Sequence, residues 1–262
     1  MSTFDTLPQN RDQALTEILL RLADDRLILG HRLSEWAGHA PELEEDLALA
    51  NIALDMIGHA SALYTYAAKI NGLKEEDWHA YFRDDIDFKN AAITELPNGD
   101  FAYSIARLFL FSVWSYLLYR ELTKTITDIQ LKGMLTKHMK EIKYHLRHSR
   151  EWVIRLGDGT KESHNRVQNA LDDLWMYTGE LFQSDPIEQA CTEFQLFTDV
   201  SGLKAEWADI VTGTLDEATL TLPVDEQFMF SGSRSGRHTE HLGWLLAEMQ
   251  FLRRSHPEAD WI

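Results

Sequence analysis

Apolar residues recur at steps of three and four along most of the 262-residue chain, the spacing that forms one face of an α-helix. This pattern predicts a first helix from about Arg11 to Trp36 and a second from about Pro41 to Ile70, joined by a short connection at Gly38. Asn71-Gly72 has the composition of a helix end. The first helix is apolar on more than one side, which is typical of a helix buried by several neighbours.

The second predicted helix carries a regular row of apolar and small residues at alternating steps of four and three. The row consists of Leu43, Leu47, Ala50, Leu54, Ile57, Ser61, Tyr64 and Ala68. Such spacing is typical of the packing seam of a helical bundle. Acidic residues between positions 42 and 46 complement the positive end of the helix dipole. We therefore expect this row to pack against the other helices of the bundle.

A looser stretch follows and ends in the turn Pro97-Asn98-Gly99-Asp100. Further helices are expected at about 101–125, 128–156, 163–182, 203–220 and 238–255, and the Ser/Gly-rich segment 231–236 has the composition of a flexible linker. No stretch predicts a pair of strands. The expected fold is all-α, a four-helix bundle of two antiparallel helical hairpins with additional flanking helices. We expect a single domain over 1–262, with a core bundle at about 11–182 and C-terminal helices at about 187–256.

Composition and charge narrow the functional classes. The chain is 44% hydrophobic and 26% charged, a globular balance, and its net charge of −17 argues against nucleic acid and anionic membranes as partners. An acyl-coenzyme A, also an anion, would need a local basic patch, for which the loop 231–237 with Arg234 and Arg237 is the candidate. The one cysteine, Cys191, excludes an intramolecular disulfide and is interpreted as a small buried residue.

Residues 1–13 lack the basic and apolar regions of a signal peptide, and no apolar run approaches the roughly 18 residues of a membrane span. A cytoplasmic protein is therefore expected. The segment His238-Thr239-Glu240-His241 does not have the His-Glu-x-x-His spacing of a zinc site. We interpret it as the start of the last helix, at an interface.

Acidic residues and histidines inside the expected bundle raise the hypothesis of a metal site. Di-iron carboxylate bundles take one glutamate from each of two helices and a Glu-x-x-His pair from each of the other two. In the first hairpin, Asp24 or Asp25 could face Asp55, and helical phase does not decide between them. The residue three positions after Asp55 is Gly58. His59, one step further, is expected to point elsewhere, although a spacing of four can also ligate a metal.

The second hairpin contributes a row of polar residues on one face of its second helix: His138, Glu141, His145 and His148. The residue three positions after Glu141 is Tyr144 rather than histidine, and the third helix has no Asp or Glu from Phe101 to Tyr119. One of the four carboxylate sources is therefore missing, and hard metal ions need such ligands. We expect a hydrogen-bonded polar seam with no metal. The alternative is a reduced metal site, with ligands Asp24 or Asp25, Asp55, His59, Glu141 and His145.

Several longer motifs resemble one known family. They are EWAGHAPELE at 35–44, DLALANI at 46–52, PNG at 97–99, YHLR at 144–147, GRHTEHLG at 236–243 and LAEMQ at 246–250. Together they extend over about 22–253 and are similar to the PaaC subunits of bacterial phenylacetyl-CoA 1,2-epoxidases. These enzymes are ferritin-like multicomponent monooxygenases of aerobic phenylacetate degradation.

The resemblance implies a division of labour among subunits. A related catalytic subunit, PaaA, carries the di-iron centre and binds the acyl-CoA, and a separate reductase delivers electrons derived from NADPH. PaaC subunits resemble PaaA in fold, lack the metal and pair with PaaA as structural partners. The resemblance thus implies a non-catalytic structural subunit with no cofactor of its own, and the many large apolar residues lead us to expect a large apolar face buried against PaaA.

Overall fold

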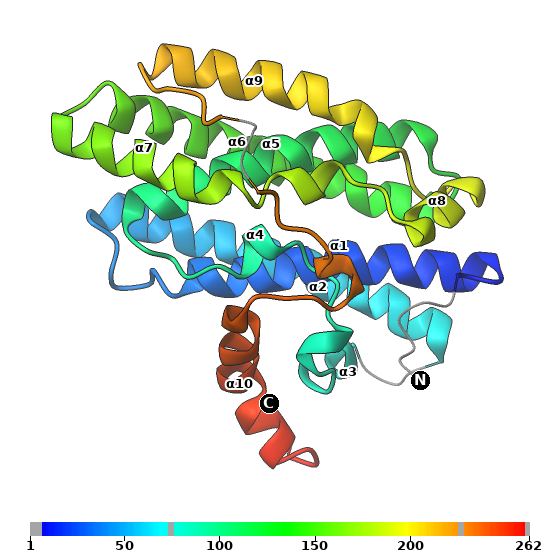
Figure 1. Cartoon of the computed structure of the whole chain (residues 1–262). Coiled ribbons are helices and arrows are strands. Elements are labelled where there is room, and N and C mark those ends of the chain that lie inside the picture. Colours follow the sequence, from blue (N-terminus) through cyan, green and yellow to red (C-terminus); the bar gives the residue numbers. More distant parts are fainter. Residues whose placement is uncertain (1–6, 73–75, 225–227, 260–262) are drawn as a thin grey trace.

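The computed structural model describes residues 7–72, 76–224 and 228–259. The prediction that residues 1–13 are not a signal peptide therefore falls partly outside the described residues. Every regular element in the described ranges is a helix, which confirms the all-α prediction. The long helices are α1 (Arg11–Ser34), α2 (Leu43–Asn71), α5 (Phe101–Thr125) and α6 (Ile129–Gly157). Helix α1 packs along α2, and α5 packs along α6, so two helical hairpins form the bundle (Figure 1).

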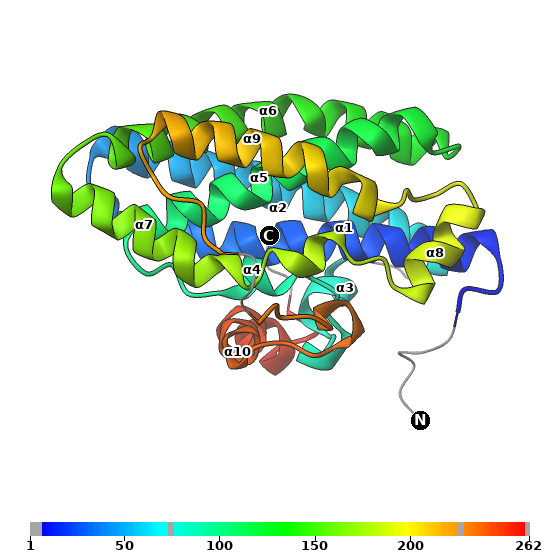
Figure 2. The ribbon, with the colours of Figure 1, turned by 45° about the horizontal axis from the view of Figure 1, so that its top comes forward.

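Shorter elements surround this bundle. The helices are α3 (Asp77–Tyr81), α4 (Ala92–Glu95), α7 (Lys161–Trp175), α8 (Pro186–Glu193), α9 (Lys204–Glu217) and α10 (Glu240–Ser255). The 3-10 turns are η2 (Asp85–Asp87), η3 (Gly179–Phe182), η4 (Val200–Leu203) and η5 (Ser233–Ser235). Helices α7 and α9 cover α5 and α6, whereas α3 and α10 stand off the opposite side of the molecule (Figures 1 and 2). The long crossover from α2 to α5 is a feature of ferritin-like bundles.

Local sequence signals set the ends of the long helices. The side chain of Asn10 accepts a hydrogen bond from the Gln13 amide at the start of α1. Asp100 and Asp128 cap α5 and α6 in the same way, at 2.9 and 2.8 Å. Each cap satisfies an amide that has no partner within its helix. Gly72 ends α2 with a left-handed backbone (φ 68°), which glycine adopts without steric cost.

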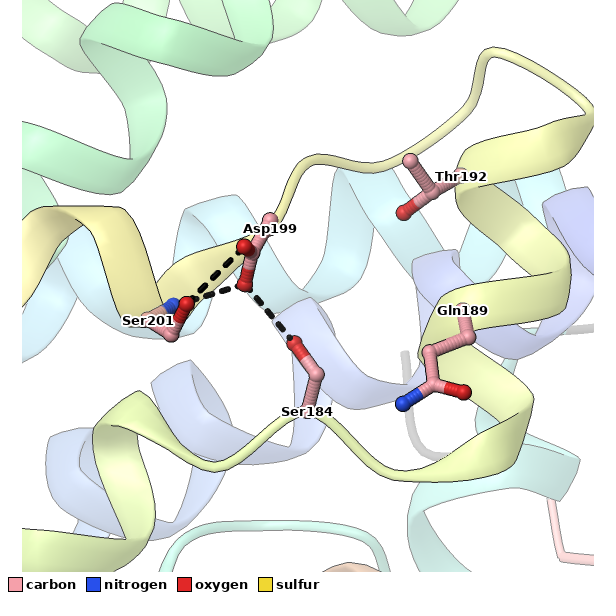
Figure 3. Close-up of a pocket in the computed structure, with 5 residues that line it drawn as sticks. All are labelled: Ser184, Gln189, Thr192, Asp199 and Ser201. Carbon is pink, nitrogen blue, oxygen red and sulfur yellow. Dashed lines mark hydrogen bonds between the residues drawn. The ribbon is translucent and has the colours of Figure 1, made fainter.

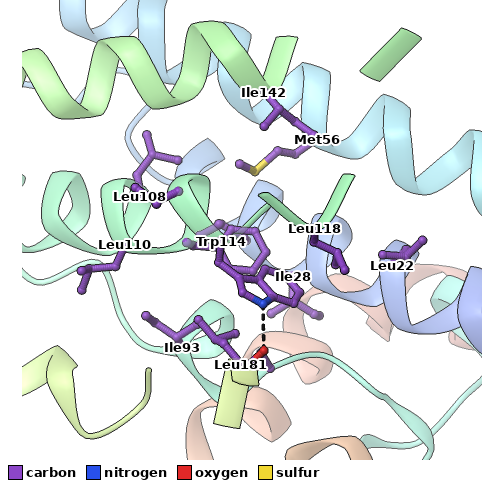
Figure 4. Close-up of a cluster of buried hydrophobic side chains, with 14 of the residues drawn as sticks. Leu22, Ile28, Met56, Ile93, Leu108, Leu110, Trp114, Leu118, Ile142 and Leu181 are labelled. Carbon is purple, nitrogen blue, oxygen red and sulfur yellow. Dashed lines mark hydrogen bonds between the residues drawn. The ribbon is translucent and has the colours of Figure 1, made fainter. Parts of the chain in front are cut away.

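Helix α5 is the centre of the hydrophobic core. Its most apolar stretch is 83% buried, and residues of every long helix pack around it (Figure 4). The indole Nε1 of Trp114 donates a 2.8 Å hydrogen bond to the backbone oxygen of Leu181, at the end of η3. This bond ties the connection after α7 to the middle of the bundle, and it satisfies a polar group that would be costly to bury alone.

Helix α2 buries only part of the expected row: Tyr64 and Ala68, near its end, lie in the core, whereas the leucines nearer its start do not. Leu43, Leu47 and Leu54 are 70, 57 and 66% exposed, so the prediction that they pack inside this chain is wrong. The buried face against α1 runs through Leu49, Met56 and other residues at helical spacing. Both rows satisfy the periodicity of a helix, and periodicity alone does not say which one the same chain covers.

Residues 228–239, the C-terminal arm, cross the α1–α4 side of the bundle before α10 begins. Arg234 forms a bidentate pair with Asp25 at 2.9 and 3.0 Å. The Ser233 hydroxyl donates to buried Glu180, and His238 Nδ1 lies 2.8 Å from the carboxylate of Glu95, which is fully buried. The expectation of a flexible linker at 231–236 is therefore wrong, because this segment is fixed by buried polar contacts.

Candidate functional site

A polar seam runs between α2 and α6. His145 Nε2 lies 3.0 Å from Asp55 Oδ2, and His59 Nε2 forms a short contact with Glu141 Oε2. The two pairs lie one helical turn apart. Because α2 and α6 run antiparallel, the step of four from Asp55 to His59 matches the step of four back from His145 to Glu141. Four of the predicted candidates thus meet, each joined to one residue of the facing helix. Further along, His148 Nε2 lies 3.2 Å from Glu45.

His59 provides the histidine that was missing at position 58, three residues after Asp55. It was expected to point elsewhere, but it is 3% exposed and shares its helix face with Asp55, one turn earlier. Gly58 is exposed, and a Cβ added to it would meet no atom within 4 Å. A histidine at position 58 would therefore face solvent. The spacing of four, not three, brings side chains of α2 into this seam.

The histidines of the seam are held in their neutral form. His59 stacks on His138 with ring centroids 3.7 Å apart, and both Nδ1 atoms are buried without a hydrogen-bond partner among the described residues. Burial is the main cause that lowers the pKa of both rings, that of His138 to about 4. Burial also raises the pKa of Glu141, and the nearby Asp55 carboxylate adds to this shift. A neutral His59 can donate its Nε2 hydrogen to Glu141.

Arg26 places a permanent positive charge inside the bundle beside this seam. Its guanidinium is buried and donates to the hydroxyls of Ser115, at 3.0 Å, and Tyr119, at 3.3 Å. It also lies 5.0 Å from the ring of Phe111 and 4.9 Å from that of Tyr119. After burial, this charge is among the causes that lower the pKa of His59, His138 and His145. Sequence inspection missed Arg26, although an arginine within the apolar run LADDRLIL is a visible signal.

The aspartates of α1 turn away from the seam. Asp24, fully buried, forms a bidentate pair with Arg83 and accepts hydrogen bonds from the Tyr64 hydroxyl and the Lys89 amide. Asp25 binds Arg234 and the Ala91 amide. Both aspartates therefore anchor segments that cross the bundle from outside, and the structure does not bring either to Asp55.

The donor set around the seam does not fit a pair of iron ions. Helix α5 contributes Ser115 and Tyr119 where a carboxylate would be needed, and α1 contributes the cation of Arg26. Asp55 and Glu141 each pair with one histidine of the facing helix. Within the described ranges, no group of three or more His, Cys, Asp or Glu side chains is arranged to hold a metal ion. A buried cation at this point would repel a second one.

The other candidates have structural roles in the described part of the chain. His238 binds Glu95 and the Phe88 carbonyl oxygen, just ahead of α10. Arg234, bound to Asp25, is not free to hold a phosphate, whereas Arg237 is exposed. Cys191 is fully buried, as expected.

A pocket of about 490 Å³ lies between α8 and η4, away from the seam (Figure 3). It is lined by Ser184, Gln189, Thr192, Asp199 and Ser201. Asp199 is held by the amide and hydroxyl of Ser201. The lining carries a negative charge and no cation, so this pocket does not suit the phosphates of coenzyme A.

Comparison with known proteins agrees with the resemblance seen in the motifs. The sequence model of the family described as phenylacetic acid catabolic protein matches residues 1–261. A curated relative, the C subunit of the 1,2-phenylacetyl-CoA epoxidase of Escherichia coli (strain K12), is 46% identical over 247 residues. The match covers 94% of this chain and 99% of the relative. The chain therefore belongs to the phenylacetic acid catabolic protein family, on the branch of the epoxidase C subunits.

Proposed function

We propose that this chain is a metal-free structural subunit of a phenylacetyl-CoA epoxidase complex, in which it pairs with and stabilises the di-iron catalytic subunit PaaA. The observation that carries the proposal is the content of the bundle centre. A buried arginine and two hydroxyls stand where a di-iron bundle needs carboxylates, and both α1 aspartates are bound to other arginines. The chain retains the bundle shape, and the carboxylates Asp24, Asp25, Asp55 and Glu141 each pair with an arginine or histidine of the same chain.

A polar interior of this kind is consistent with a structural role, in which this chain keeps one conformation. Buried ion pairs and hydrogen-bonded networks favour one arrangement of the helices, because any shift leaves charged groups without partners. A rigid bundle of the same fold offers the catalytic subunit a fixed surface against which to pack its own metal-binding helices. The chemistry of oxygen activation then belongs wholly to the partner, in the cytoplasm, with the reductase acting on the partner and not on this chain.

Metal analysis of the purified chain beside its complex tests the proposal. We expect no bound iron in the isolated chain, including after reconstitution with ferrous iron, and iron in the complex that follows the amount of PaaA. Co-expression gives a second readout, because PaaA without this chain should be less soluble and less active. The alternative of a reduced metal site is favoured if the isolated chain binds iron stoichiometrically and Asp55→Asn abolishes the binding. PaaA that is equally soluble, metal-loaded and active alone would refute the structural role.

A further inference from the structure

The outward face of α2 is apolar although nothing in the described chain covers it. Leu43, Leu47 and Leu54 project from this face at 57–70% exposure. The helices α2 and α5 are both long and apolar enough to cross a membrane by length and composition, but 44% of the most apolar stretch of α2 is buried inside the protein, against 83% for α5. Gly58 and Ser61 continue the same exposed row, and such small residues allow another helix to approach closely.

The outward face of α6 is basic although the chain as a whole carries a net charge of −17. The helix contains seven lysines and arginines and only two glutamates. Lys137, Lys140, Lys143 and Arg147 are all exposed at helical spacing, and Tyr144 stands among them at 38% exposure with the Arg147 guanidinium 5.6 Å from its ring. This basic face was not predicted from the sequence, where only the 231–237 loop was expected to be locally basic.

The two faces are neighbours. The polar seam joins α2 to α6 along their length, and charges of α6 act across it, Lys137 on His59 and Arg155 on Glu45. Each helix has 29 residues and is therefore about 43 Å long. With two helix widths of about 10 Å each, the combined face has an area of roughly 800 Å², which is what each partner buries in an interface of standard size.

We propose that the outward face of α2 and α6 is the surface on which the catalytic subunit docks, and that the partner presents an apolar helix row bordered by acidic side chains. This inference rests on the proposed function and adds the surface and the chemistry of the partner. The exposed leucines of the predicted α2 row, Leu43, Leu47 and Leu54, pack against a helix of another subunit. The lysines and arginine of α6 then lie at the rim, opposite carboxylates.

Charge decides between this partner and other occupants. An anionic bilayer would also attract an apolar and basic face, but the remaining surface of a chain with net charge −17 opposes it. A second copy of this chain would have to place one basic face against another, because a symmetric dimer joins identical surfaces. A protein partner with acidic side chains around an apolar row matches both components of the face.

Binding of purified variants to purified PaaA tests the assignment. In the apolar row, Leu54→Glu and Leu47→Glu place a charge in the centre of the interface and should each weaken binding at least about 30-fold. The matched control is Val224→Glu, since Val224 is 63% exposed and lies after α9, away from α2. It should leave affinity unchanged. Because all three positions are exposed, the circular dichroism spectrum and melting temperature should stay at the wild-type values.

The basic rim is tested by reversing charge. Lys140→Glu combined with Lys143→Glu should slow association about tenfold or more and weaken its dependence on salt, because rim charges act mainly on the encounter rate. The control is Lys161→Glu with Lys204→Glu, which changes net charge equally at exposed positions at the starts of α7 and α9. It should change the association rate far less.

The outcomes distinguish an error in the docking surface from an error in the proposed function. If wild-type chain binds PaaA and the α2 and α6 variants bind equally well, the surface is wrong and the structural role stands. If wild-type chain binds no epoxidase subunit, the proposed function itself fails. Light scattering that finds a dimer of the isolated chain, dispersed by Leu54→Glu, would assign the face to a second copy. Flotation with phosphatidylserine vesicles, lost in the same variant, would assign it to a membrane; either result overturns the proposal.

Discussion

Asp24→Asn is the substitution that best separates a structural from a metal-binding role of the α1 aspartates. Asp24 is fully buried and accepts bonds from both terminal nitrogens of Arg83, at 2.5 and 3.0 Å, and from the Lys89 amide at 2.8 Å. Asparagine keeps the shape and can still accept from Lys89, but it removes the charge. Arg83, itself 5% exposed, is then left as a buried cation without its counter-ion.

The unpaired charge of Arg83 determines the expected loss of stability. Removing one partner of a buried ion pair destabilises a protein by about 3–5 kcal/mol. For a chain of this size that corresponds to a fall in melting temperature of roughly 6–20 °C. Arg83→Met added to Asp24→Asn should restore part of the loss, because it removes the unpaired guanidinium. We expect this recovery to be visible in urea unfolding followed by circular dichroism.

The control is Asp84→Asn, since the Asp84 side chain is 70% exposed and pairs with Arg254 at the surface. Its free energy of unfolding should change by less than about 1 kcal/mol. The reasoning is refuted if Asp24→Asn costs no more than this control. It is also refuted if the substitution lowers bound metal while leaving the stability of the metal-free chain untouched, because Asp24 would then act as a ligand.

Three further predictions concern other parts of the chain. Burial lowers the pKa of His138 from 6.5 to about 4, so the unfolded chain takes up a proton at this residue before the folded chain does as the pH falls. The free energy of unfolding should therefore decrease by about 3 kcal/mol between pH 6.5 and pH 4. Urea titrations over this pH range should show a weaker dependence for His138→Gln. Gly157→Ala should lower the free energy of unfolding by at least about 2 kcal/mol, because the added Cβ would clash with the carbonyl oxygen of Ala218 and lie 2.9 Å from the Cβ of Ala218. Gly213→Ala, where the added Cβ meets no atom within 4 Å, should raise it by up to about 1 kcal/mol. Thermal melts of the two variants test both expectations. Burial raises the pKa of the Cys191 thiol to about 12, so a disulfide reagent should label it only after unfolding, and rapid labelling of native chain would contradict its burial.

The sequence predicted the helices that carry strong local signals. The helix Phe101–Thr125 has the predicted limits: the turn at 97–100 marks its start, where Asp100 caps it, and the backbone is extended at Ile126. The expected helix at 163–182 instead ends at Trp175 and resumes as η3, and α3, α4 and α8 were missed. Of these, α8 had a readable signal in Asp185-Pro186, a capping residue followed by a first-turn proline.

The candidate site was only partly predictable. Asp55, His59, Glu141 and His145, which the metal-site alternative grouped together, do meet, because helical spacing places each pair on one face of its helix. The fate of Asp24 and Asp25 depended on Arg83 and Arg234, which are 59 and 209 positions away along the chain. No local pattern indicates such distant partners. The burial of Leu43, Leu47 and Leu54 was predicted wrongly for a related reason. A helix with two rows of apolar residues at helical spacing does not reveal from its sequence which row packs inside its own chain.

The C-terminal arm makes completion of the fold depend on residues that are synthesised after all four long helices. Asp25, Glu95 and Glu180 pair with Arg234, His238 and Ser233 only after these later residues have been synthesised. Until then each of these carboxylates lacks one of its buried partners, which makes its burial costly. A nascent or proteolytically shortened chain ending before residue 233 should therefore expose its core to chaperones and proteases. Cellular quality control would thus distinguish complete from incomplete copies by whether this arm is in place.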